Sequence, residues 1–257
     1  MSLNNNTMHH FDQERTGWNP HESVLNINNV NNTNFKKLFE HNVDGDVFAQ
    51  PLYIQNITIP QKGIHNVLYV ATENDMVYAF DADSNIGQNA NPLWARNLCL
   101  DGEVPVPNGD IPGGLCTDIN PHIGITSTPA IDISNNILYV VAKSKNTSKN
   151  KYFQRIHALD ITSGNEIHNS VEIKANDQGI TFNPLLQFNR SGLLLNKGVL
   201  YIAFACHCDV RPYYGWIMAY DVGNPNTPSF LTQIAVKNLN PIPAHTLNPL
   251  DLGGGIW

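Results

Sequence analysis

Charged side chains are scarce in this sequence of 257 residues: they make up 14% of it, against 42% hydrophobic residues. The formal net charge is −7 and the sequence has no basic cluster, which excludes an electrostatic surface for nucleic acid. No apolar run approaches the roughly 18 residues of a membrane-spanning helix, so we expect no membrane span. The hydrophobic content is sufficient for a folded core.

Cysteine is also rare, with four residues in the chain. Cys99 and Cys116 bracket a loop rich in proline and glycine. This spacing predicts a disulfide if the protein is exported and two free thiols if it is not. The first residues lack the basic start and apolar stretch of a signal peptide, so the sequence itself indicates no compartment.

A repeated pair of strands is the strongest positive feature of the sequence. Each copy has a Leu-Tyr strand followed by a strand ending in Ala-x-Asp, and the Leu-Tyr pairs begin at residues 68, 138 and 200. The copies are Val67–Ala71 with Val77–Asp81, Ile137–Val141 with Ile156–Asp160, and Val199–Ala203 with Ile217–Asp221. Such a unit is typical of repeat architectures and suits a four-stranded propeller blade. The sequence therefore predicts an all-β fold: a β-propeller of four-stranded antiparallel blades, with about three blades and the start of a fourth.

The repeat divides the chain into two parts. We expect an irregular N-terminal lead-in over residues 1–34 and a propeller over residues 35–257, in which Phe35–Val43 forms a closing strand. The predicted blades span residues 47–98, 124–174 and 190–237, and a fourth begins at residues 250–257. Three blades form an open arc with two uncovered faces. We expect these faces to be covered by the lead-in, by self-association or by the remainder of a propeller.

Two segments resemble the repeat of quinoprotein-like β-propellers, the pyrroloquinoline quinone (PQQ) repeat. They are Ala158–Gly164, with its Ser-Gly turn, and Gly124–Asp132. The resemblance covers roughly residues 45–257 and is nearest to uncharacterised bacterial proteins, whose members are usually exported. It implies a periplasmic or secreted protein.

The repeat of that family places a tryptophan four residues after the turn glycine, where it docks one blade on the next. Trp94 takes this part in the first blade after an insertion. In the second blade the position is His168, and in the third Phe230 is the nearest aromatic residue.

Quinoprotein dehydrogenases of this fold bind PQQ on the axis with Ca²⁺, against a tryptophan and beside two adjacent disulfide-bonded cysteines. This chain departs from that pattern, because His207 separates Cys206 from Cys208 and no Ca²⁺-ligand set aligns with it. PQQ and calcium are therefore implied by the resemblance alone. On the predicted axis, Gly254 and Gly255 would let the backbone pass closely beside Trp257.

The long predicted loops emerge on one face of the propeller, where we expect a small ligand or a protein to bind. His122 lies there as a candidate cofactor-binding residue together with Gly254, Gly255 and Trp257, or as a hydrogen-bonded loop histidine.

Four consecutive residues on the same face are candidate metal ligands: Cys206, His207, Cys208 and Asp209. Thiolates and imidazole suit zinc or copper, but strand alternation opposes their convergence. The alternative is a loop edge that packs small residues. Glu73 and Asp75 form either a weak cation site or a solvated turn.

These observations predict an extracytoplasmic binding or scaffold propeller. The alternative is a PQQ- and Ca²⁺-dependent dehydrogenase that oxidises an alcohol or sugar, or an inactive remnant of one.

Overall fold

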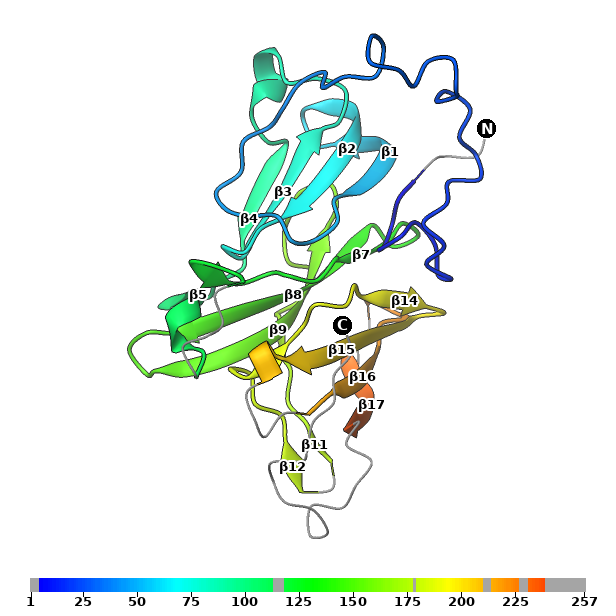
Figure 1. Ribbon diagram of the computed structural model, residues 1–257. Helices are drawn as coiled ribbons and strands as arrows, with labels where there is room; N and C mark the ends of the chain where they lie inside the picture. The colour runs from blue at the N-terminus through cyan, green and yellow to red at the C-terminus, as the bar shows by residue number, and fades with distance from the viewer. Residues whose placement is uncertain (1–4, 113–117, 178, 210–213, 227–230, 239–257) are drawn as a thin grey trace.

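The computed structural model describes residues 5–112, 118–177, 179–209, 214–226 and 231–238 (Figure 1). Within these ranges the chain forms antiparallel β-sheets and no α-helix, which confirms the predicted all-β fold. Three short 3-10 turns lie in the connections: η1 (Gly87–Ala90), η2 (Asn108–Asp110) and η3 (His207–Asp209). No helix in the described ranges is long and apolar enough to cross a membrane.

The first sheet has four antiparallel strands in chain order. They are β1 (Leu52–Ile59), β2 (Gly63–Ala71), β3 (Met76–Asp81) and β4 (Trp94–Asn97). β2 and β3 are the first copy of the repeat, and Val67 pairs with Asp81 as the Leu-Tyr and Ala-x-Asp pattern predicts.

The second sheet is built on two long strands. Its members are β5 (Glu103–Pro107), β6 (His122–Ile123), β7 (Ala130–Asp132), β8 (Ile137–Asn146), β9 (Lys151–Asp160) and β10 (Val171–Glu172). β7 pairs with the first half of β8, and β5 pairs with its second half on the same edge. The segment expected to be a long loop between the first two blades therefore contributes two strands.

The third sheet repeats this arrangement. Its strands are β13 (Gln187–Phe188), β14 (Leu194–Asn196), β15 (Val199–Cys206), β16 (Trp216–Asp221) and β17 (Thr232–Asn238). β14 pairs with the first half of β15 and β13 with its end. A separate hairpin of β11 (Asn176–Asp177) and β12 (Ile180–Thr181) projects from the connection before it (Figure 1). The predicted fourth blade, residues 250–257, lies outside the described residues.

The second sheet is buried on both faces, because the side chains of β8 alternate between two cores. Leu138 and Val140 belong to the core shared with the first sheet. Ile137 and Tyr139 belong to the core shared with the third sheet. The three sheets therefore stack face to face in chain order, as propeller blades do.

The predicted docking position between blades is used at both junctions. The Trp94 indole of β4 donates a 2.9 Å hydrogen bond to the carbonyl of Ile161 in the turn that follows β9. Gly164 lies against the indole, and a Cβ at that glycine would come within 2.5 Å of it. His168 makes the next contact, through a ring nitrogen that bonds to the carbonyl of Pro225. Phe230 lies outside the described residues.

The predicted closing strand at Phe35–Val43 is wrong, since these residues pair with no strand among those described. The segment of residues 39–46 instead covers the outer face of the first sheet. His41 stacks on Phe80 at 4.4 Å, and Asp44 accepts a 2.8 Å hydrogen bond from the Thr72 hydroxyl. One of the two faces expected to be open is therefore covered by the chain, although not by the first 34 residues.

Candidate functional site

The N-terminal segment, residues 5–17, crosses the first strands of the stacked sheets. Asn6 exchanges two backbone hydrogen bonds with Tyr53 of β1, at 2.8 and 3.0 Å. The carbonyl of Thr7 then accepts a 2.8 Å bond from the backbone of Ile131 in β7. These contacts cover exposed strand edges and bring residues 9–15 to the third sheet.

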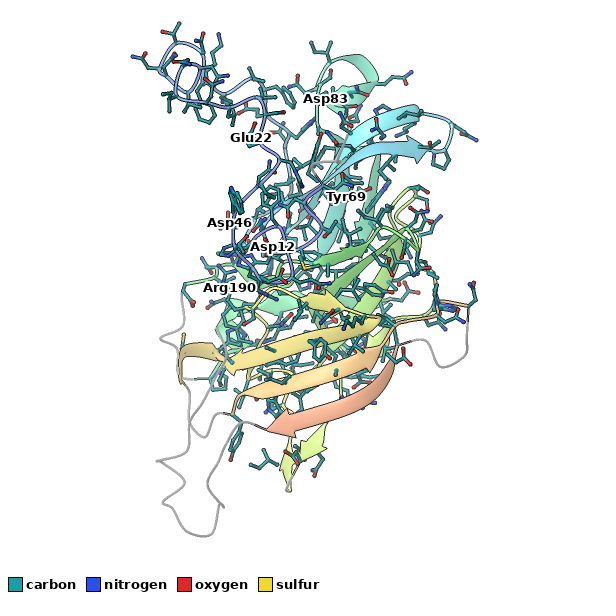
Figure 2. The ribbon with its side chains drawn as sticks, turned by 90° about the vertical axis from the view of Figure 1, so that its right-hand side faces the viewer. Asp12, Glu22, Asp46, Tyr69, Asp83 and Arg190 are labelled. Carbon is teal, nitrogen blue, oxygen red and sulfur yellow. The ribbon has the colours of Figure 1, made fainter. Side chains whose placement is uncertain are left out.

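A pocket of about 680 Å³ lies between this segment and the third sheet. We call it the Arg15–Arg190 pocket. Its lining comprises His9, Arg15, Arg190, Ser191, Gly192, Leu194, Tyr201, Ile202, Ala203 and Ile217. Figure 2 shows Arg190 at the third sheet with Asp12 of the N-terminal segment above it. The pocket thus joins residues that are far apart in the sequence.

One wall of the pocket is the free face of the third sheet, turned away from the second. Along β15, Leu200 and Phe204 point into the core, so the alternating residues Tyr201 and Ala203 point outward. Ile217 of β16 pairs with Ala203 on this face. Tyr201 and Ile217 are each 38% exposed. This wall offers an apolar surface beside the charged residues.

Two arginines form the opposite side, and backbone carbonyls hold both of them. Arg190 donates through Nη1 to the carbonyls of Phe48 and Thr126, each at 3.1 Å. Arg15 donates through Nη2 to the carbonyl of Gly192 at 2.7 Å. A guanidinium has five N–H donors, so both groups keep donors beyond these bonds.

The positive charge of the two arginines is not neutralised within the described residues. None of the ion pairs found there includes Arg15 or Arg190. Burial lowers the pKa of His9, and the nearby His10, Arg15 and Arg190 lower it further. The field of both arginines therefore reaches His9, whose neutral ring remains available for hydrogen bonding.

The predicted metal ligand His207 is held in a different contact. Lys143 Nζ lies 2.7 Å from His207 Nε2 and donates to the carbonyls of Leu185 and Gln187. The imidazole stacks on Phe188 with ring centroids 4.3 Å apart. Burial lowers the pKa of Lys143 to about 7, and burial together with Lys143 lowers that of His207 to about 2. His207 is thus a neutral imidazole inside the protein.

The other predicted ligands lie around the end of β15. Cys206 is buried and forms no disulfide, and Cys208 has a left-handed backbone with φ of 48° in the same turn as Asp209. In the part of the chain that the structure describes, no three His, Cys, Asp or Glu side chains are grouped to hold a metal ion.

The predicted disulfide between Cys99 and Cys116 is wrong, because Cys99 has a free thiol. Its sulfur lies 3.5 Å from Asp75 Oδ2 and donates to it. Burial and the carboxylate of Asp75 raise the pKa of Cys99 far above its usual range, so the thiol is protonated. Cys116 lies outside the described residues.

One of the two interpretations of Glu73 and Asp75 was a solvated turn. In the structure this turn is buried. The two residues are 2% and 0% exposed. Gly124 makes this possible, since a Cβ there would come within 2.2 Å of the Glu73 carbonyl. His122 Nδ1 lies 2.9 Å from the side-chain oxygen of Asn74, as expected of a hydrogen-bonded loop histidine.

Three predicted cofactor-binding residues, Gly254, Gly255 and Trp257, lie outside the described residues. The cofactor pair that the resemblance implies therefore finds no support among the residues described: His122 is engaged with Asn74, and no described cluster supplies a calcium ligand set. No chemical step is derived through PQQ or Ca²⁺.

Sequence reasoning missed the Arg15–Arg190 pocket. Neither Arg15 nor Arg190 belongs to a sequence pattern that indicates a binding site. The contact that joins the two sides, from Arg15 to Gly192, spans 177 residues. No local pattern reports a contact of that range.

Comparison with known proteins yields distant structural similarity alone. No family model matches the chain, and no curated protein matches it. Among solved structures, the chain is similar to the crystal structure of quinohemoprotein alcohol dehydrogenase from Comamonas testosteroni, with 17% sequence identity and a TM-score of 0.45. The similarity covers 76% of this chain and 21% of that chain, so this chain spans about a fifth of the length of the protein it resembles.

Proposed function

We propose that this chain is a periplasmic or secreted β-propeller binding protein whose ligand site is the Arg15–Arg190 pocket. One observation carries the proposal: two arginines without a described carboxylate partner line a cavity of about 680 Å³ together with an apolar sheet face. That volume lies within the roughly 300–1,000 Å³ of small-molecule sites. The site lies on the free face of the third sheet, not on the long-loop face where we expected ligands.

The alternative of a PQQ-dependent dehydrogenase, or of its inactive remnant, has the repeat resemblance in its favour. Calorimetry with PQQ, with and without Ca²⁺, distinguishes the alternatives. Saturable binding that requires Ca²⁺ would favour the dehydrogenase and call for a dye-linked alcohol assay. We expect no Ca²⁺-dependent binding.

The ligand site itself is tested with a neutral fluorescent probe, N-phenyl-1-naphthylamine, excited above the absorption of tryptophan. The probe should gain fluorescence saturably with the wild-type protein. Ala203→Trp fills the pocket and should abolish the gain, because the indole would stand on the apolar wall. Ile64→Trp is the matched control, since Ile64 is 69% exposed and lies outside the pocket lining.

Circular dichroism would show whether each variant is folded. If Ala203→Trp does not fold, Ile217→Trp blocks the same wall from a more exposed position. Equal probe binding by folded pocket variants and by Ile64→Trp would refute the assignment of the site.

A further inference from the structure

We propose that the ligand of the Arg15–Arg190 pocket is an organic monocarboxylate with an apolar body. The inference rests on the proposed function and adds the chemical class of the ligand. The carboxylate would lie at the two arginines and the apolar body along Tyr201, Ala203 and Ile217.

The two arginines and His9 line the same pocket, and both arginines lower the pKa of His9. Arg15 bonds to the carbonyl of Gly192, and Gly192 also makes room for His9: a Cβ at this glycine would lie 2.6 Å from the Cβ of His9. Arg190 comes two residues before Gly192 in the chain. Glycine at position 192 therefore allows the N-terminal segment to approach Arg190.

An anion would supply a charge partner that both arginines lack among the described residues. Both guanidinium groups line the same pocket, and none of the ion pairs found in the described ranges includes either of them. Their carbonyl contacts orient the groups without removing charge. Charge-assisted hydrogen bonds from a planar guanidinium to a carboxylate are among the stronger polar contacts in proteins.

The apolar wall limits the class further. Tyr201 and Ile217 are each 38% exposed, and burial of that surface favours a ligand with a hydrocarbon or aromatic body. An inorganic anion would leave the wall uncovered, and a neutral lipid would leave the arginines unpaired. A ligand with both parts satisfies both sides of the pocket.

A ligand of this kind would also bridge two elements of the fold. Arg15 and His9 belong to the N-terminal segment, whereas Arg190 and the apolar wall belong to the third sheet and its approach. Binding should therefore favour the docked N-terminal segment over the detached one. The Arg15–Thr16 peptide bond, a trypsin site, should then become more resistant to cleavage.

The test compares three eight-carbon probes by calorimetry at low salt: octanoate, 1-octanol and octylammonium. Octanoate should bind most tightly and should protect the Arg15–Thr16 bond from trypsin, as followed by mass spectrometry. Arg15→Gln should weaken octanoate binding on the order of tenfold or more and should weaken 1-octanol binding much less. Lys36→Gln, which removes one exposed positive charge outside the pocket lining, should change neither.

Arg190→Lys gives a second variant, because it keeps the charge and loses the planar fork; it should weaken octanoate binding while circular dichroism stays that of the wild type. If 1-octanol binds as tightly as octanoate and Ala203→Trp blocks both, the pocket is a ligand site but the carboxylate assignment is overturned. Tighter binding of octylammonium overturns it as well. If none of the probes, nor the neutral naphthylamine, binds, the proposed function fails with it.

Discussion

The buried lysine at position 143 makes the strongest prediction about stability. Lys143 is 3% exposed, and its Nζ atom contacts His207 and two carbonyls inside the protein. Asp75 and Cys206 also face it, and their charged forms raise its pKa, but burial has the larger effect and lowers it to about 7 from 10.5. The folded protein therefore favours the uncharged amine.

The sign of the pH dependence follows from this shift. Between pH 10.5 and 7 the unfolded chain binds a proton at Lys143 that the folded protein does not, so unfolding becomes easier as the pH falls. The stability linked to this amine is complete above pH 10.5 and is lost as the pH falls to about 7. Each unit of pKa difference corresponds to about 1.4 kcal/mol, so the ceiling over the whole interval is about 5 kcal/mol.

Lys143→Met removes the titration. Wild-type protein should gain up to about 1.4 kcal/mol of unfolding free energy per pH unit relative to this variant between pH 7.5 and 9.5. At pH 7 the unfolding free energies of the two proteins should be closer, because two effects of the substitution oppose each other. The variant no longer buries a charge, but it leaves His207 and the carbonyl of Leu185 without the hydrogen bonds from Lys143, at about 1–3 kcal/mol per group left unpaired.

Urea unfolding followed by tryptophan fluorescence measures this difference at each pH. Lys149→Met, at an exposed residue in the connection between β8 and β9, is the control and should give a curve parallel to wild type. A parallel curve for Lys143→Met itself would show that the amine does not change its proton occupancy on unfolding, and would refute the reasoning.

Two further predictions concern the contacts between sheets. Gly124→Ala should destabilise the fold by about 1–3 kcal/mol, because the new methyl group would meet the backbone of Glu73; Gly109→Ala, with nothing within 4 Å, should change stability far less in the same urea assay. Trp94→Phe should lower stability by about 1 kcal/mol, since Tyr69 still donates a 3.0 Å bond to the Ile161 carbonyl that Trp94 also contacts. Tyr69→Phe should lower stability more in the Trp94→Phe background than in the wild type, because the Ile161 carbonyl then loses both donors. Additive effects of the two substitutions in a double-mutant cycle would contradict this shared contact.

The repeat carried most of what could be predicted about the fold. Strands that alternate between two cores, such as β8, begin with an apolar run, here Ile137–Ala142, and the Ala-x-Asp ending marks the partner strand. The prediction failed at Phe35–Val43, where Phe35 and Leu38 are exposed and only the end of the segment lies over the first sheet. A short apolar pattern without a repeated partner therefore did not predict burial.

The candidate sites were harder to predict for a related reason. Cys206 is the last residue of β15 and His207 is the first residue of the turn η3. The imidazole contacts Lys143 of the second sheet. Asp75 was expected at a solvated turn, but the adjoining Gly124 brings a second segment over it. Both outcomes depend on contacts between sheets, which a single sequence does not display.

The two outer faces of the stack differ in a way that bears on what binds. Residues 39–46 cover the outer face of the first sheet, where Phe80 is only 1% exposed. On the third sheet the N-terminal segment contacts the approach to β14 and leaves Tyr201 and Ile217 partly exposed. A ring of copies joined first face to third face would have to displace residues 39–46. Within the described part of the chain, the third face is thus better suited to a ligand held beside Arg15 and Arg190 than to the first sheet of a second copy.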